Sequence, residues 1–436
     1  MELKVVKFGG SSLADANQFK KVKEIITADE SRRYVVPSAP GKRFSDDTKV
    51  TDMLYQCYEC ASRGENIDSL FDKIRERYNT IIKELELDFS LEEDFDVIKS
   101  AFRHKSGRDY AASRGEYLNG KVLAKYLGYD FIDAANVIFF KMDGSFDSEK
   151  TNEVLSKVLE NHTHAVIPGF YGSMPNDTIK TFSRGGSDIT GSIVARAAHV
   201  TLYENWTDVS GFKMADPRII KDPKTIEYIT YRELRELSYM GATVLHEDAV
   251  FPVRMMGIPI NIKNTNAPLD KGTMIVSEAP EEANCSVITG IAGKKNFSVV
   301  RIEKDMMNQE LGFGRRVLEV FEKNGISFEH LPSGIDTMSV VVAQNTIEDK
   351  KEQLLHDLFK SVTPDHITIE DGYALIAVVG RGMVSTKGTA SKIFSSLSDS
   401  GVNIKMIDQG SSELNIIIGV KNEDFEKAMN SIYMAF

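Results

Sequence analysis

KFGGSS, at residues 7–12, directly follows the apolar stretch LKVV at residues 3–6 and is the most informative part of this chain. A short strand, a glycine pair and two hydroxyls at the start of a helix form a pattern typical of a phosphate-binding turn in an α/β fold. Gly9 and Gly10 can turn backbone N–H groups toward an anion because they carry no Cβ atom. Lys7 precedes the glycines, unlike the lysine of the Walker pattern, and could lie across a transferring phosphoryl group. Taken alone, these residues also fit an ordinary turn.

A second glycine-rich cluster, SRGGSDITGS at residues 183–192, precedes a run with helical periodicity. Ser187 or Asp188 could simply cap that helix. An arginine, two glycines and an aspartate near one helix start would also suit an anionic substrate beside a metal-bound phosphate. Between the two clusters lies SRGE at residues 113–116, which on its own could be a surface Arg/Glu pair.

In this order and at about this spacing, the three motifs resemble those of the aspartate kinase branch of the amino-acid kinase family. TDVSGF at residues 207–212 and ADPR at 215–218 are similar to the nucleotide-binding segment of that family. GATVLH at 241–246 and IPINI at 258–262 resemble the end of its catalytic domain. The resemblance covers essentially the whole chain.

The order of apolar runs agrees with this resemblance. β-type runs at 5–8, 33–36, 129–132, 165–167, 200–204 and 258–262 alternate with helical ones, which predicts parallel βαβ units. We expect an α/β fold with an amino-acid-kinase-like sheet sandwiched by helices, followed by two ferredoxin-like (ACT) α+β domains. The catalytic domain is placed at 1–280, with a helical insertion at about 63–108 whose charged residues form a solvated face.

Beyond a linker at residues 277–282, a strand–helix–strand–strand–helix pattern occurs twice. We place the first unit at 291–366 and the second at 367–436, and one could be inserted in the other. Such pairs resemble ACT domains, which are small-molecule sensors attached to enzymes of amino-acid metabolism. The alternative is two ferredoxin-like domains that serve only as a dimer interface, and we favour sensing together with dimerisation.

Composition excludes several classes of protein. Hydrophobic residues make up 42% and charged residues 27% of the chain, which is typical of a globular protein. The net charge of -11 argues against nucleic acid as a principal partner. The pair Cys57 and Cys60 has no second C-x-x-C motif, so neither zinc nor redox chemistry is expected there. We find no signal peptide and no stretch that could span a bilayer, and expect a cytoplasmic protein.

The resemblance implies transfer of the γ-phosphoryl group of ATP to the β-carboxylate of L-aspartate, giving 4-phospho-L-aspartate and ADP, the first step to lysine, threonine and methionine. A carboxylate is already a competent nucleophile, so the site needs in-line positioning and charge neutralisation instead of a general base. The implied cofactors are ATP and Mg²⁺, with magnesium as the nucleotide chelate and no metal-binding cage of protein residues.

The resemblance also assigns roles to residues of the motifs. Lys7 would neutralise the transferring group, while Asp188 would orient either Lys7 or a magnesium shell, two roles that stay open. Arg184 would clasp the α-carboxylate of aspartate as a planar fork, and Glu116 would meet its α-ammonium. The other expected site residues are Thr51 and Ser187 for substrate and Gly9, Gly10, Ser11, Thr207, Asp208, Lys213 and Arg218 for nucleotide. Two departures from the family pattern are Lys213, where tyrosine is frequent, and Lys42 with Arg43, which could form a phosphate-side flap or simply be solvated.

ACT domains usually bind an amino acid where the first strand-to-helix loop faces a paired unit, which implies a homodimer or a dimer of dimers. In the first repeat the expected effector residues are Met307, Phe313, Gly314, Ser327, Phe328 and Glu329. Glu329 offers a negative charge to the distant ammonium of lysine, whereas the matching position of the second repeat is Lys405. We therefore expect lysine to bind the first repeat and to inhibit the enzyme; the alternative is that Glu329 is an ordinary exposed strand residue.

Two other functions remain open from the sequence. One is an amino-acid kinase that acts on a different carboxylate substrate, such as glutamate. The other is a catalytically silent amino-acid sensor, which loss of Lys7, Glu116, Arg184 or Asp188 would favour; all four are present.

Overall fold

A computed structural model of the 436-residue chain describes all residues except 1, 105, 184, 243–244, 246–248 and 282–285. The chain forms two compact units, and each is described by itself. The first comprises Met1–Phe212, Thr225–Tyr231 and Thr243–Ala279, and the second Lys213–Lys224, Arg232–Ala242 and Pro280–Phe436. Within the described residues, no helix is both long and apolar enough to cross a membrane.

An eight-stranded sheet organises the first unit, in the order β3-β4-β2-β1-β7-β9-β10-β8. Neighbouring strands are parallel except for β9 and β10. Its strands are β1 (Lys4–Phe8), β2 (Arg32–Pro37), β3 (Asp130–Phe131), β4 (Ala165–Val166), β7 (Leu202–Thr207), β8 (Tyr228–Thr230), β9 (Ile260–Asn264) and β10 (Thr273–Val276). A hairpin of β5 (Tyr171–Ser173) and β6 (Ile179–Thr181) lies outside this sheet.

Helices cover both faces of the sheet. Val6 and Phe8 of β1 point into a core shared with α1 to α5. Lys7 lies between them, so its side chain points to the other face, where it meets α7. This arrangement confirms the predicted sheet sandwiched by helices. The helices of the unit are α1 (Ala16–Thr27), α2 (Val50–Ser62), α3 (Asp68–Glu84), α4 (Glu92–Arg103), α5 (Arg108–Leu127), α6 (Ser148–Leu159), α7 (Gly186–Ala197) and α9 (Phe251–Arg254), with the 3-10 turns η1 (Gly10–Leu13) and η2 (Ala134–Asn136).

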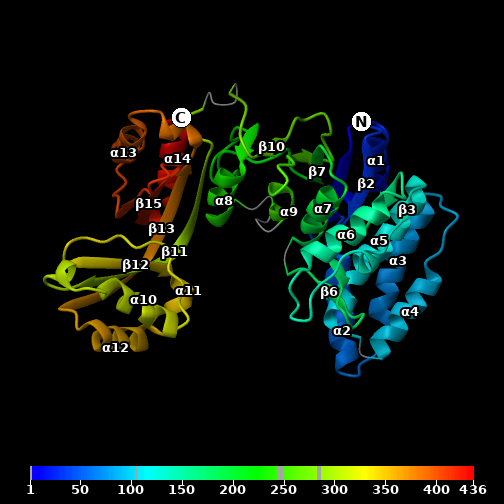
Figure 1. Ribbon diagram of the computed structural model, residues 1–436, viewed down its shortest axis with the longest axis horizontal. Coiled ribbons are helices and arrows are strands. Elements are labelled where there is room, and N and C mark those ends of the chain that lie inside the picture. The colour runs from blue at the N-terminus through cyan, green and yellow to red at the C-terminus, as the bar shows by residue number, and fades with distance from the viewer. Residues whose placement is uncertain (1, 105, 184, 243–244, 246–248, 282–285) are drawn as a thin grey trace. The chain divides into compact units, whose positions relative to one another are not determined.

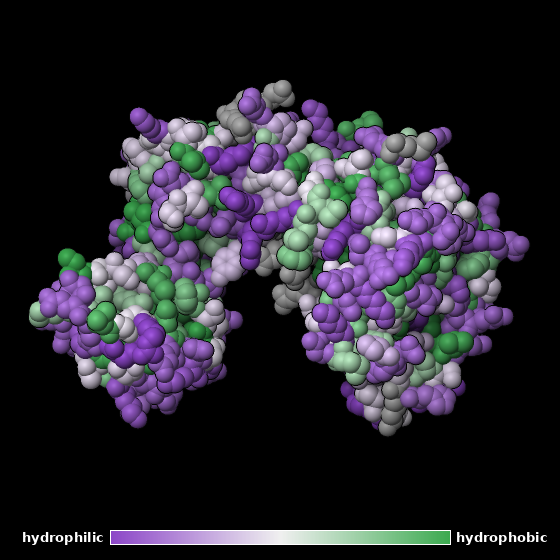
Figure 2. All heavy atoms as spheres, viewed as in Figure 1, coloured by the Kyte–Doolittle hydropathy of each residue, from purple (hydrophilic) through white to green (hydrophobic). Residues whose placement is uncertain are grey.

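Helices α3 and α4 occupy the region expected to be a helical insertion, and in Figure 1 they lie beside α5. Phe71 of α3 makes edge-to-face contacts with Phe95 and Phe102 of α4, with both centroid distances 6.2 Å. These rings belong to the same core as α2 and α5, so the insertion packs firmly on the rest of the unit. Hydrophilic side chains predominate on the face of this unit that Figure 2 shows.

The second unit is built on one antiparallel sheet in the order β12-β11-β13-β15-β14. α10 and α12 share a core with β11 and β12. α14 packs on β11, β13 and β15, and also contacts α13. The elements are β11 (Gly290–Glu303), α10 (Phe313–Lys323), β12 (Thr337–Ala343), α11 (Gln344–Ile347), α12 (Lys351–Val362), β13 (His366–Val379), α13 (Thr389–Asp399), β14 (Met406–Asp408), β15 (Asn415–Lys421) and α14 (Phe425–Met434), with the 3-10 turns η5 (Met307–Gln309), η6 (Arg381–Val384) and η7 (Asn422–Asp424).

The long strands β11 and β13 are shared by the two repeats. Residues 290–295 of β11 pair with 374–379 of β13, and residues 299–303 pair with 366–370. Bulges between residues 295 and 299 separate the two stretches. The N-terminal stretch of β11 thus pairs with the second repeat, which is the pairing that insertion of the first repeat in the second requires.

Two segments from the expected catalytic domain belong to the second unit. Ile291 of β11 donates its N–H to the carbonyl oxygen of Met214 at 2.6 Å. Glu233 of α8 (Tyr231–Tyr239) is fully buried and accepts hydrogen bonds from Thr289 and Arg381. The two compact units therefore do not separate at the single boundary near residue 280 that the composition indicates.

Candidate active site

Lys7 lies at the end of β1 and is 7% exposed. Its Nζ atom lies 2.5 Å from Oδ1 of Asp188, in the first turn of α7, and the same oxygen accepts from Asn205 of β7 at 2.8 Å. β1 and β7 are adjacent parallel strands, so their carboxyl ends bring Lys7 and Asn205 to one place. The structure therefore joins the two predicted catalytic residues and adds Asn205, which the motifs did not indicate.

The glycine turn is held by backbone contacts on two sides. Gly9 donates its N–H to the carbonyl oxygen of Trp206 at 3.0 Å, and Gly41 donates to the carbonyl oxygen of Gly10 at 2.8 Å. A Cβ atom on Gly10 would lie 2.9 Å from the Ala39 carbonyl oxygen, and one on Gly41 would lie 2.6 Å from the carbonyl carbon of Gly10. The turn and the loop after β2 are thus in direct backbone contact, which explains the need for glycine at both positions.

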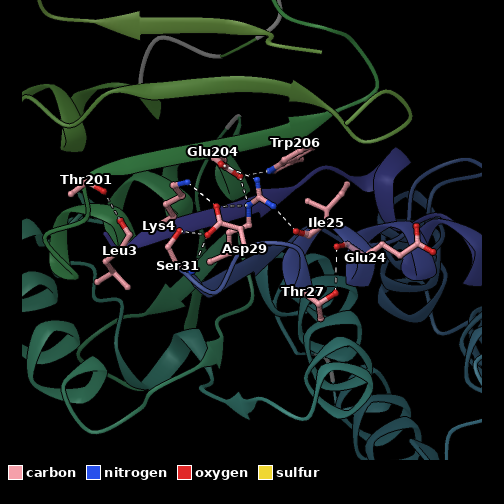
Figure 3. A network of polar contacts seen from close by, with 11 residues as sticks. Leu3, Lys4, Glu24, Ile25, Thr27, Asp29, Ser31, Thr201, Glu204 and Trp206 are labelled. Carbon is pink, nitrogen blue, oxygen red and sulfur yellow. Dashed lines mark hydrogen bonds and ion pairs between the residues drawn. The ribbon is translucent and has the colours of Figure 1, made fainter. Parts of the chain in front are cut away.

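A network of polar contacts joins residues of β1, β2 and β7 (Figure 3). The carboxylate of Glu204 accepts from the indole Nε1 of Trp206 at 2.8 Å and from two guanidinium nitrogens of Arg32 at 2.9 and 3.2 Å. Lys4 and Asp29 form a second ion pair beside it, with 2.8 Å between Nζ and Oδ2. Trp206 is therefore held through its ring, while its carbonyl oxygen holds Gly9.

Glu116 of α5 is 6% exposed, and burial raises the pKa of its carboxyl to about 8. Among the described atoms, its Oε2 has no hydrogen-bond partner. A buried acceptor of this kind is costly unless a donor arrives. The site thus offers a place for a cationic group such as an ammonium.

Arg114, the neighbour of Glu116 in the SRGE motif, is also buried. Its guanidinium donates to the hydroxyl of Ser113 and lies 4.5 Å from the ring centroid of Tyr117 and 4.6 Å from that of Tyr110. The interpretation of this motif as a surface Arg/Glu pair is therefore wrong, because both side chains lie inside the unit.

Ser187, near the start of α7, is 7% exposed and approaches Gly169 so closely that a Cβ atom there would lie 2.7 Å from the Ser187 hydroxyl oxygen. Phe170 follows Gly169 and has a left-handed backbone with φ of 82°. Such a φ is uncommon for a non-glycine residue and marks a constrained site. Sequence reasoning missed Phe170, since no residue pattern shows a positive φ at phenylalanine.

The remaining predicted residues are distributed between the units. Thr51 lies in the first turn of α2, and Thr207 with Asp208 at the end of β7, all in the first unit. Lys213 and Arg218 belong to the second unit, where Arg218 is paired with Asp216 at 2.6 Å. Arg184 lies outside the described residues.

The predicted effector residues differ among themselves. Met307 and Phe313 are buried in the core beneath α10, while Phe328 is 43% exposed. Glu329 donates its N–H to Val341 at 2.8 Å, and its carboxylate accepts from the hydroxyl of Tyr239. Ser327 lies beside Phe328 and is exposed, and Gly314 lies at the start of α10. Of this set, the side chains of Ser327, Phe328 and Glu329 are those available to a ligand.

Comparison with known proteins agrees with this geometry. Residues 2–264 match the model of the amino acid kinase family, and residues 376–436 match an ACT domain model. Aspartokinase 3 of Bacillus subtilis is 38% identical over 449 residues, covering 100% of this chain and 98% of its own length. The crystal structure of Clostridium acetobutylicum aspartate kinase, described as an allosteric enzyme, is 54% identical with a TM-score of 0.92 over 100% of both chains. E. coli aspartokinase III in complex with aspartate and ADP has the same fold, with 23% identity and a TM-score of 0.76 over 100% of both chains.

The chain therefore belongs to the amino acid kinase family. Within that family it is an ATP-dependent aspartate kinase, with an ACT domain in its C-terminal part.

Proposed function

We propose that the enzyme transfers the γ-phosphoryl group of ATP to the β-carboxylate of L-aspartate, giving 4-phospho-L-aspartate and ADP as the first step to lysine, threonine and methionine. The observation that carries this proposal is the largely buried Lys7–Asp188 pair beside the Gly10 turn, in the same unit as Glu116, one of whose oxygens has no partner among the residues that the structure describes. One feature suits a phosphoryl group and the other an ammonium, and aspartate phosphorylation needs both.

In the proposed reaction an oxygen of the β-carboxylate attacks the γ-phosphorus. The new O–P bond forms as the bond from this phosphorus to the bridging oxygen breaks, and ADP leaves with that electron pair. No proton moves, so Lys7 acts by neutralising charge on the transferring group. Mg²⁺ bound as the nucleotide chelate would supply further charge neutralisation; the carboxylate of Asp188 could face its hydration shell.

The binding roles follow from charge and position. Glu116 would receive the α-ammonium of aspartate, and Arg184 its α-carboxylate, with Ser187 and Thr51 on the substrate side. Backbone N–H groups of Gly9 and Gly10 and the hydroxyl of Ser11 would face phosphate oxygens. Thr207, Asp208, Lys213 and Arg218 are the proposed nucleotide contacts.

Acceptor identity can be tested by ADP release with aspartate or glutamate and by trapping the product with hydroxylamine, which converts an acyl phosphate to a hydroxamate. Release and hydroxamate with aspartate alone are expected. Equal turnover of glutamate would favour an amino-acid kinase with another substrate, and no turnover of either would favour a silent sensor.

For regulation we propose that lysine binds the first ACT repeat through Glu329 and that the repeats form a homodimer or dimer of dimers. The carboxylate of Glu329 is already paired with the hydroxyl of Tyr239 in α8, so an ammonium arriving there would compete with that bond or share it. Lysine would inhibit by binding more tightly to a less active arrangement of the enzyme.

A further inference from the structure

Arg77 is an unusual residue of the charged helix α3 because its side chain is only 3% exposed. Arg75, two residues earlier, is 30% exposed and pairs with Glu92 and Asp96 of α4 at the surface. Arg75 therefore lies at the surface, as expected for a charged residue of this helix, whereas the side chain of Arg77 points into the first unit.

The guanidinium of Arg77 reaches two loops of the site. Its NH2 nitrogen donates to the carbonyl oxygens of Gly41 at 2.6 Å and Ala14 at 3.0 Å, and its NH1 nitrogen donates to Oδ2 of Asp47 at 2.8 Å. Ala14 ends the turn that begins at Gly10, while Gly41 and Asp47 lie in the loop after β2. One planar side chain thus holds both loops, a geometry that the single ammonium of lysine cannot reproduce.

Asp47 is fixed from a second side. Arg43 donates to it through its backbone N–H at 3.0 Å and through its guanidinium at 2.8 and 2.9 Å. Hydrogen bonds from Arg43, with a smaller contribution from Arg77, hold the pKa of Asp47 far below its usual range despite partial burial. The carboxylate of Asp47 therefore stays ionised over the pH range of enzyme assays, and its hydrogen bonds with Arg43 stabilise this loop.

The contact of Arg77 with Gly41 leads directly to the phosphate-side turn. Gly41 donates its N–H to Gly10 in a contact too close for any Cβ atom, so a displacement of Gly41 must move Gly10 as well. The next residue of the helix, Tyr78, donates its hydroxyl to the carbonyl oxygen of Gly115 at 2.7 Å, beside Glu116. Consecutive residues of α3 thus contact the segments that carry the proposed phosphate and ammonium sites.

We propose that Arg77 is a positioning residue for phosphoryl transfer, through which the helical insertion fixes the Gly10 turn against the loop at residues 41–47. This inference rests on the proposed role of the turn around Lys7. Small displacements of positioned groups cost about 10²-fold in rate, so a loss of this support should be visible in turnover.

The test compares Arg77→Lys with the matched control Arg75→Lys on the full-length enzyme. Arg77→Lys should lower kcat by about tenfold or more, with a smaller change in KM for ATP and aspartate, because loop alignment matters most in the transition state. Arg75→Lys should leave kcat within about twofold. Thermal unfolding and near-UV circular dichroism establish that each variant is folded.

A folded Arg77→Lys enzyme with wild-type kcat would overturn the proposal, as would an equal loss in Arg75→Lys. If Arg77→Lys does not fold, Asp47→Asn serves as the second variant, since it removes the charge that orients the Arg77 guanidinium toward the carbonyl oxygens of Ala14 and Gly41. Its kcat should fall severalfold, and an unchanged kcat would overturn the proposal. The activity of each variant is divided by that of wild type, measured with the acceptor that wild type phosphorylates. If that acceptor is not aspartate, the assay of wild type shows it, and the ratio of variant to wild type still tests the role of Arg77.

Discussion

The sequence assigns ligand contacts both to the turn around Lys7 and to the loop at residues 307–314. In the structure, the side chains of these two regions have different environments. At the turn, polar side chains from β1, β7 and α7 converge, and Glu116 in the same unit has an oxygen without a partner in the described part of the chain. In the loop, Met307 and Phe313 turn into an apolar core. A buried charged side chain is costly without a partner, so a cluster of such side chains indicates a binding site. Buried apolar side chains are explained by packing alone.

The strongest test of this comparison is Lys7→Ala. Removing one preorganised charge should lower kcat by about 10²-fold or more in a folded enzyme. Lys4→Ala is the matched control, because Lys4 lies on the same strand and pairs with Asp29 away from the turn. Normal turnover of Lys7→Ala would show that the convergence at the turn is structural.

The next largest effect is expected in the pH dependence of kcat/KM for aspartate, through the carboxyl group of Glu116. Its raised pKa, about 8, means that the free enzyme carries a neutral carboxyl below that pH and gains the carboxylate above it. If the α-ammonium binds the carboxylate form, kcat/KM for aspartate should rise roughly tenfold or more between about pH 6.5 and 8.5. Glu116→Gln should have a low kcat/KM that no longer follows this titration; a wild-type profile in the variant would count against the assignment.

Phe313→Leu tests the other region. The substitution removes ring atoms from a packed core and should reduce the free energy of unfolding by about 1 kcal/mol, measured by denaturant titration. Turnover per folded enzyme and inhibition by lysine should stay unchanged. If the variant loses inhibition by lysine but keeps the wild-type free energy of unfolding, then Phe313 contacts the effector as the sequence predicted.

The smallest effect on catalysis is expected for Glu329→Ala. Glu329 is not among the proposed catalytic, substrate or nucleotide residues, so kcat without effector should stay near wild type. Inhibition by millimolar lysine should disappear, because the variant lacks the charge that meets the distant ammonium. Lys405→Ala should remain inhibited. If wild type ignores lysine and responds to threonine, the proposed effector is wrong while the kinase activity stands.

The sequence predicted the sheet and the covering helices, and it left open whether Asp188 orients Lys7 or a magnesium shell; the structure pairs Asp188 with Lys7. Other features depend on contacts between distant residues. In the sequence, Arg77 cannot be told apart from the other charged residues of a solvated helix. Its burial depends on contacts with loops that lie 30 to 63 residues earlier in the chain. Likewise, residues 213–224 and 232–242 were expected in the catalytic domain, and only their packing assigns them to the second unit.

The shared strands β11 and β13 have a consequence for how such an enzyme can be rebuilt. Because each strand serves both repeats, no cut between the repeats leaves either with its full set of hydrogen-bonded neighbours. A transplanted pair of repeats would have to bring both strands with it, and a deletion of one repeat would expose strand edges prone to aggregation. The two repeats can therefore be exchanged only as a whole.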